Sequence, residues 1–185
     1  GGWWDWLTPF SLLTGASLVA GYALLGACWL IAKTEGRTRD DARRFARIAL
    51  PALIGALGAV SLATPFLDGQ YYQRWFVSPG LFVTVPMPLL VAAVALLLWR
   101  SLKRDVDGHP FLYALALFGL SFAGLAISIW PDVIPGRVSI WDAAVPHSSQ
   151  LFMLVGAGIM LPIILAYTGW SYWVFRGKVR AGGYH

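Results

Sequence analysis

Long apolar stretches separated by short polar ones set the pattern of this chain. Five runs contain no Asp, Glu, Lys or Arg: 8–32, 48–67, 77–99, 111–130 and 143–175. Each run is about as long as a helix needs to cross the ~30 Å hydrocarbon core of a bilayer. With their caps and turns, the runs predict helices at 8–33, 47–67, 80–100, 110–130 and 146–175. We therefore expect an all-α integral membrane protein, a bundle of about five transmembrane helices in a single domain over residues 1–185.

Prolines and polar residues near the ends of these runs refine the predicted helices. Thr8 and Pro9 have the residue types preferred at the cap and first position of a helix. Pro51 is expected in the first turn of the second helix, where its missing N–H costs nothing. Pro86 indicates either a late start or a kink in the third helix, and Pro162 a bend in the last.

Composition and charge support a membrane protein and predict its orientation. Hydrophobic residues make up 58% of the chain and charged residues only 12%, about half the usual share for a soluble domain. Twelve of the 14 basic residues fall on one side if five helices alternate, and five acids there leave that side at +7. The other side has two bases and four acids. The excess of positive charge predicts an outer N-terminus and a cytoplasmic C-terminus, and its division among alternate loops argues against nucleic-acid binding.

Tryptophans cluster near both predicted boundaries, as in the aromatic belts of membrane proteins. Those expected at the outer face are Trp3, Trp4, Trp6, Trp75, Trp130 and Trp141, and those at the inner face are Trp29, Trp99, Trp170 and Trp173.

The stretch IWDAAVPHSSQ, residues 140–150, is the most polar junction between two apolar runs. We favour a structural interpretation, in which Asp142 or Ser148 caps the last helix and Pro146 rigidifies its first turn. The alternative is a polar pocket for a quinone carbonyl, a lipid headgroup or a partner subunit, lined by Asp142, Ser148, Ser149 and Gln150.

Residues able to carry redox or proton chemistry are scarce. No predicted helix has a charged side chain at its centre, where proton and ion pathways usually need one. The histidines at 109, 147 and 185 lie at predicted helix ends or the terminus, and the single cysteine, Cys28, is interpreted as a packing residue. No metal-ligand spacing or phosphate-binding loop occurs. We assign no residue to catalysis or metal binding.

Three stretches resemble a known family. They are LTPFSLLTGASLVAGYALLGACWLIAKTEG (7–36), PFLYALALFGLSFAGLAISIWPDVIP (110–135) and SIWDAAVPHSSQLFMLVGAGIMLPIILAYTGWSYWVFRGKV (139–179). Together they look like the C-terminal half of subunit II of the cytochrome bd-type quinol oxidases, including the cyanide-insensitive branch. The Lys-Thr-Glu-Gly end of the first helix and the Trp-Asp-Ala step followed by Ser-Ser carry much of the likeness. Asp132 and His147 depart from the expected pattern.

The resemblance implies a subunit of a bacterial respiratory oxidase in the cytoplasmic membrane, which oxidises quinol and reduces dioxygen to water. It places haem b and haem d in a partner, subunit I, and none on this chain. Other implied partners are the N-terminal half of subunit II, which carries the acidic residues of the proton path, and membrane lipids. An independent transporter or channel and a structural membrane assembly module are the alternatives.

Two binding sites for a quinone or for lipids are also expected. A structural quinone or lipid in this half would meet an outer pocket of Trp141, Asp142 and Gln150. On the inner side, we expect anionic lipid headgroups at Lys33, Arg37 and Arg43.

Overall fold

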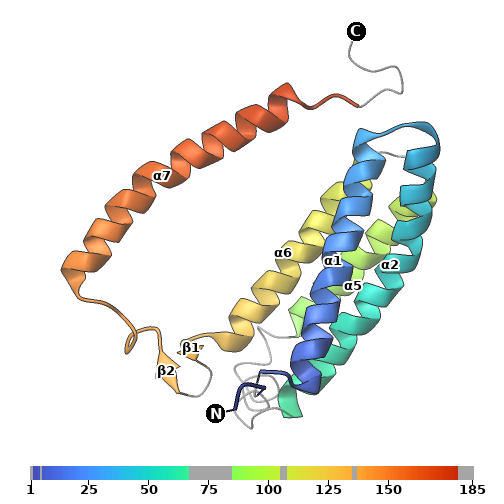
Figure 1. The fold of residues 1–185 in the computed structure, drawn as a ribbon. Coiled ribbons are helices and arrows are strands. Elements are labelled where there is room, and N and C mark those ends of the chain that lie inside the picture. The colour runs from blue at the N-terminus through green and yellow to red at the C-terminus, as the bar shows by residue number, and fades with distance from the viewer. Residues whose placement is uncertain (1, 5, 67–84, 105–107, 135–136, 179–185) are drawn as a thin grey trace. The chain divides into compact units, whose positions relative to one another are not determined.

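The computed structural model describes residues 2–4, 6–66, 85–104, 108–134 and 137–178. In chain order the elements are α1 (Pro9–Lys33), α2 (Gly36–Ala63), the 3-10 turn η1 (Thr64–Phe66), α5 (Pro86–Lys103), α6 (His109–Ile129), the strands β1 (Asp132–Ile134) and β2 (Val138–Ser139), and α7 (His147–Val174) (Figure 1). Among the described residues, five helices are long and apolar enough to cross a membrane. The prediction of an all-α membrane protein with five spans is confirmed, and the two short strands are an addition to it.

The start of α1 follows its sequence signal. Thr8 is the N-cap, Pro9 the first helical residue, and Thr8 and Ser11 form a reciprocal capping box. The Ser11 N–H donates to Thr8 Oγ1 at 3.0 Å, and the Thr8 N–H donates to Ser11 Oγ at 2.9 Å. Two N–H groups that the helix leaves unpaired are thereby satisfied.

A two-residue connection joins α1 to α2 through the Lys-Thr-Glu-Gly stretch. Thr34 ends α1, and both its N–H and its hydroxyl donate to the Leu30 carbonyl, at 2.9 and 2.7 Å. Gly36 begins α2 with φ of 62°, a left-handed conformation that an L side chain rarely adopts. Glycine at this position therefore allows the chain to reverse within a few residues.

The second helix differs from its prediction at the N-terminal end. It begins at Gly36 rather than near residue 47, so most of the expected basic loop is helical. Pro51 consequently lies inside the helix, and its predicted place in the first turn is wrong. Arg and Ala favour helix at 36–47, and Ala42, Ala46 and Leu50 bury one face of it. The burial of that face compensates for the backbone hydrogen bond that Pro51 removes from the helix.

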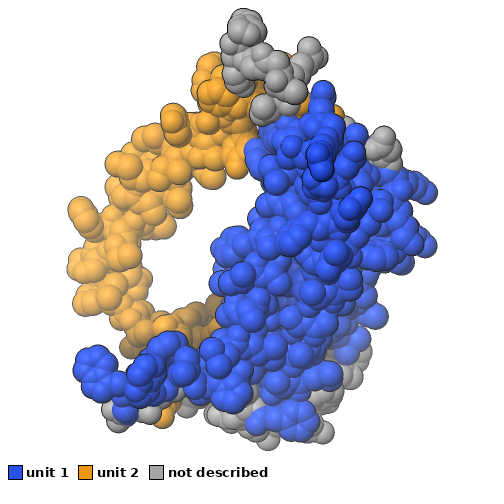
Figure 2. Space-filling model, turned by 45° about the vertical axis from the view of Figure 1, so that its right-hand side comes forward, with its two compact units in different colours: residues 1–128, 179–185 blue, residues 129–178 orange. Residues whose placement is uncertain are grey.

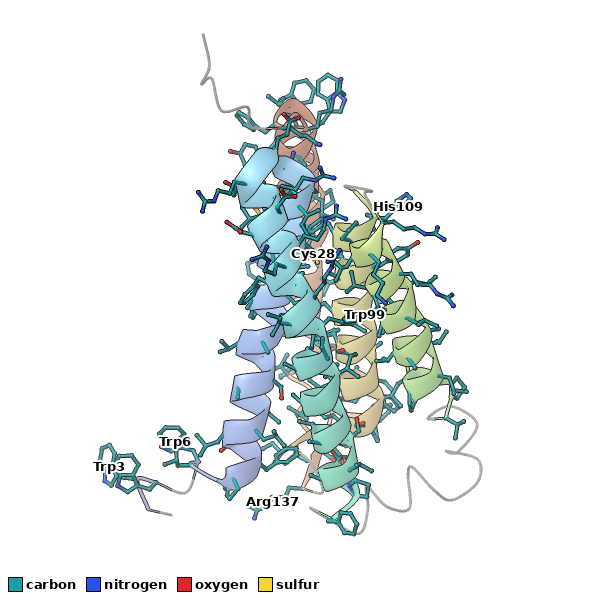
Figure 3. The ribbon with its side chains drawn as sticks, turned by 90° about the vertical axis from the view of Figure 1, so that its right-hand side faces the viewer. Trp3, Trp6, Cys28, Trp99, His109 and Arg137 are labelled. Carbon is teal, nitrogen blue, oxygen red and sulfur yellow. The ribbon has the colours of Figure 1, made fainter. Side chains whose placement is uncertain are left out.

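At 28 residues, α2 is about 42 Å long, which exceeds the ~30 Å hydrocarbon core. The hairpin of α1 and α2 extends past the ends of α5 and α6 (Figures 1 and 3).

Residues 1–128 form a compact unit in which four helices share one core. Its most buried side chains come from every helix of the unit: Leu24, Cys28 and Ile31 of α1, Ala46 and Leu50 of α2, Leu98 and Leu102 of α5, and Ala114 and Leu117 of α6. Rings join α1 to α6, with centroids 5.2 Å apart for Tyr22 and Phe118 and 4.9 Å for Trp29 and Phe111. Trp99 and His109 lie toward the end where α1 meets α2, and Trp3 and Trp6 lie to the side of the opposite end (Figure 3).

Residues 129–178 form a second compact unit (Figure 2). Its strands are antiparallel, with Asp132 opposite Ser139 and Ile134 opposite Val138. The β-branched residues Val133, Ile134 and Val138 favour this ribbon. The single-domain organisation stays a prediction.

The remaining helices agree with their predicted ranges, except at the start of α5. α5 begins at Pro86, which selects the late start over the kink, although predicted residues 80–84 lie outside the described part. α6 and α7 begin and end within one residue of their predicted limits. Pro162 lies inside α7, as expected.

Candidate functional site: the polar junction and the basic helix ends

The polar junction is organised by Ser139 and Asp142. The Ser139 hydroxyl donates to Asp142 Oδ2 at 2.6 Å, and the Asp142 N–H donates to Ser139 Oγ at 3.2 Å. The Ser139 N–H points to the same carboxylate at 3.4 Å, and the Ala143 N–H donates to the Ser139 carbonyl at 3.0 Å. This is the reciprocal bonding of a capping box, used here for a single turn at 139–143.

The predicted capping of the last helix is therefore wrong. The N-cap of α7 is Pro146, with no side-chain hydrogen bond, and Ser148 is already inside the helix. Asp142 is engaged one turn upstream instead. Pro146 stands where the chain enters the helix with φ of −51°, and the first N–H bonds of α7 run from Ser149 and Gln150 to its carbonyl at 3.0 and 3.1 Å.

The three residues predicted to line an outer pocket have separate partners. Trp141 packs edge-to-face on Trp130 with ring centroids 5.8 Å apart, Asp142 bonds Ser139, and the Gln150 amide donates to the Val145 carbonyl at 2.8 Å. All three are exposed, and none is a partner of another. Each polar group thus serves the local backbone, and the quinone or lipid pocket stays a prediction.

The inner basic residues divide into two kinds. The Lys33 ammonium lies 5.0 Å from the centre of the Trp29 ring, and Arg37 is exposed. Arg43, by contrast, is only 8% exposed, and its Nη1 donates to the Arg104 carbonyl. The structure thus gives Arg43 a contact between helices, and the expected headgroup contact of Lys33, Arg37 and Arg43 stays a prediction.

Arg47, which sequence reasoning did not single out, continues this contact. Its Nε and Nη2 both donate to the Leu102 carbonyl, at 3.1 and 2.7 Å. The last carbonyls of a helix have no partner within it, so Arg43 and Arg47 of α2 supply donors for the end of α5. We call these two residues the arginine clasp. Their four-residue spacing on the face of Ala42, Ala46 and Leu50 was the signal available in the sequence.

Tryptophan and a basic residue also meet at two further helix ends. The Lys103 ammonium lies 5.2 Å from the centre of the Trp99 ring at the end of α5, and Arg176 lies 5.0 Å from that of Trp173 after α7. Such cation–π pairs keep the charge near water while the indole stays in the apolar layer. The pairs lie at helix ends that were predicted to be cytoplasmic, and their role as membrane anchors stays a prediction.

Groups suited to ligate a metal do not converge in the described part of the chain, where no three His, Cys, Asp or Glu side chains come together. Cys28 is fully buried in the apolar core of α1, α2, α5 and α6. His109 and His147 are exposed at the first residues of α6 and α7. The described polar residues of the junction and the helix ends make capping hydrogen bonds and cation–π contacts.

The sequence is similar to known proteins of one family. A family model described as "Cytochrome bd terminal oxidase subunit II" matches residues 1–175. A probable cytochrome oxidase subunit 2 of Haemophilus influenzae is 28% identical over 213 residues, covering 98% of this chain and 55% of that protein. Cytochrome bd ubiquinol oxidase subunit 2 of Bacillus subtilis is 23% identical, with 95% and 52% covered, and cytochrome bd-I ubiquinol oxidase subunit 2 of Escherichia coli K12 is 22% identical, with 97% and 55% covered. The chain spans about half the length of these curated relatives. It belongs to the cytochrome bd terminal oxidase subunit II family.

Proposed function

We propose that this chain is the non-haem-bearing part of a bacterial cytochrome bd-type quinol:oxygen oxidoreductase. It packs in the cytoplasmic membrane against a haem-bearing subunit I and the other half of subunit II. In the assembled complex, electrons from quinol reduce dioxygen to water, and this chain supports the subunit in which those steps occur.

The observation that carries the proposal is the composition of the helix centres. The central turns of α1, α5, α6 and α7 contain no Asp, Glu, Lys or Arg, and in α2 such residues end at Arg47. A proton or ion path through a membrane protein needs such groups at depth. This favours a supporting subunit over an independent transporter.

The described cysteine and histidine side chains are not arranged to ligate a haem. A haem iron takes an axial His, Met, Cys or Tyr facing a cavity large enough for the macrocycle. Cys28 lies in tightly packed apolar surroundings with 0% exposure, and the described histidines stand at helix ends. We propose that haem b and haem d are bound by subunit I, as the family resemblance implies.

Orientation is part of the proposal. The ends that carry Trp29 with Lys33 and Trp99 with Lys103 would face the cytoplasm, because basic residues are retained on that side. The N-terminal tryptophans would then anchor in the outer leaflet.

Affinity purification of the tagged chain from its native membrane tests the function. We expect a haem-bearing subunit to co-purify, with haem absorbance and quinol-dependent oxygen consumption. A mock preparation from an untagged strain is the control. Recovery of a haem-free protein that moves a solute after reconstitution would overturn the proposal.

A further inference from the structure

The C-terminal end of α5 carries three exposed bases. Arg100 and Lys103 are three residues apart and are therefore neighbours on the helix surface, and Arg104 follows as the C-cap with extended backbone. Trp99 is half-buried against the core, and the Lys103 ammonium lies over its ring. This pairing sets the depth of the turn, because an indole of this kind prefers the boundary between lipid tails and headgroups.

Two more cations reach the same turn from α2. Arg43 and Arg47 donate to the Arg104 and Leu102 carbonyls, so five basic side chains converge on one helix end. A helix C-terminus is partly negative and would ordinarily disfavour an anion. Here guanidinium groups of the clasp donate to the Leu102 and Arg104 carbonyls, which offsets this partial negative charge. Asp105 and Asp107 follow in the sequence and offset two of the five charges, which leaves the group net positive.

The other basic end is more nearly balanced. With Arg43 and Arg47 counted at α5, the connection and first turns of α2 hold four bases (Lys33, Arg37, Arg39 and Arg44) and three acids (Glu35, Asp40 and Asp41), a net charge of +1 against +3 at the end of α5. The charge that could attract an anion is therefore diluted there by acids on the same short segment.

We propose that the C-terminal turn of α5, with Arg100, Lys103 and Arg104 as its exposed cations, is a docking surface for the phosphate groups of anionic phospholipids in the adjacent leaflet. The occupant we infer is a lipid headgroup, because Lys103 lies over the Trp99 ring and an indole of this kind prefers the layer between lipid tails and headgroups. The inference does not rest on the proposed oxidase function. It requires only that α5 spans a membrane.

Photo-crosslinking with lipid probes tests the proposal. The purified protein, with any subunits that accompany it, is placed in nanodiscs of equal parts phosphatidylglycerol and phosphatidylcholine. A photoactivatable analogue of one lipid or the other is added, and crosslinks are mapped by mass spectrometry. We expect the phosphatidylglycerol probe to label the peptide of residues 95–104 in preference to the phosphatidylcholine probe, and less strongly at high salt.

Matched variants separate charge from structure. Each basic residue near an anionic surface contributes about 1 kcal/mol, so Lys103→Gln should lower the preference for phosphatidylglycerol roughly fivefold. The triple variant Arg100→Gln, Lys103→Gln, Arg104→Gln should abolish the preference for phosphatidylglycerol, because it removes all three exposed charges. It should leave the arginine clasp intact, because the clasp bonds backbone carbonyls, which these substitutions keep. Lys103→Arg keeps the charge and should retain the preference. The proposal would be overturned by an unchanged preference in the triple variant, by equal labelling with both probes, or by labelling confined to residues 29–44. Haem content and oxygen consumption are measured separately.

Discussion

Arg43 and Arg44 are adjacent on α2, and substituting each in turn distinguishes loss of the clasp from loss of a positive charge. Arg43 is 8% exposed and donates to the Arg104 carbonyl, whereas the Arg44 side chain is exposed. Arg43→Gln and Arg44→Gln each remove one positive charge. Only Arg43→Gln removes a donor from the end of α5.

The expected cost of Arg43→Gln comes from that donor. A hydrogen bond to a charged group contributes about 1.5–3 kcal/mol, and the loss falls on a buried side chain with little access to replacement water. For a chain of this size, such a loss lowers the unfolding temperature by roughly 3–12 °C. Arg44→Gln, a surface change, should stay within about 0.5 kcal/mol.

The only cysteine of the chain provides the assay. Cys28 has 0% exposure inside the four-helix core, so it becomes reactive when this core opens. The purified protein is heated in steps with a thiol-alkylating reagent, and the modified fraction of the Cys28 peptide is measured by mass spectrometry. Equal midpoints for both variants would refute the clasp. So would an Arg43→Gln variant that melts normally but binds less anionic lipid, the result expected of a headgroup ligand.

Other positions give predictions of their own. Gly36→Ala should destabilise the α1–α2 hairpin by about 1–2 kcal/mol, because a Cβ is unfavourable in the left-handed region; the same alkylation midpoint should fall. Ser139→Ala and Asp142→Ala should each cost about 1 kcal/mol in thermal stability and leave turnover per haem unchanged. The double variant should be little worse than either single one, since both remove one capping box, and fully additive losses would contradict this. Arg44→Cys should react with an impermeant maleimide only in inverted vesicles and Trp6→Cys only in right-side-out ones; the reverse pattern would contradict the predicted orientation.

The helices could be predicted from sequence because a bilayer demands about twenty apolar residues for each span. The start of α1 was accurate because Thr8 and Pro9 give a local signal, whereas α5 begins at Pro86, the later of the two starts considered and six residues after the predicted limit. The start of α2 could not be predicted from the charged residues at 36–47, because such residues are also typical of loops between membrane spans. Arg and Ala are good helix formers, and a helix can continue into water when one face packs on its neighbour.

The sites were less predictable because polar side chains choose among local partners. Asp142 has the residue type of an N-cap, yet Ser139, three residues earlier, offers a closer and reciprocal partner. Likewise, Arg43 has the charge expected of a lipid ligand, and only the path of α5 reveals the carbonyl that it bonds. Residue type gives the capacity to bond, whereas chain geometry selects the partner.

The way α5 ends has a consequence for how this chain tolerates change. Its terminal turn is held from the side by α2, through the donors of Arg43 and Arg47. Insertions or deletions just after Arg104 should therefore leave the helix in place, which makes this position a natural site for an epitope tag or a fluorescent reporter.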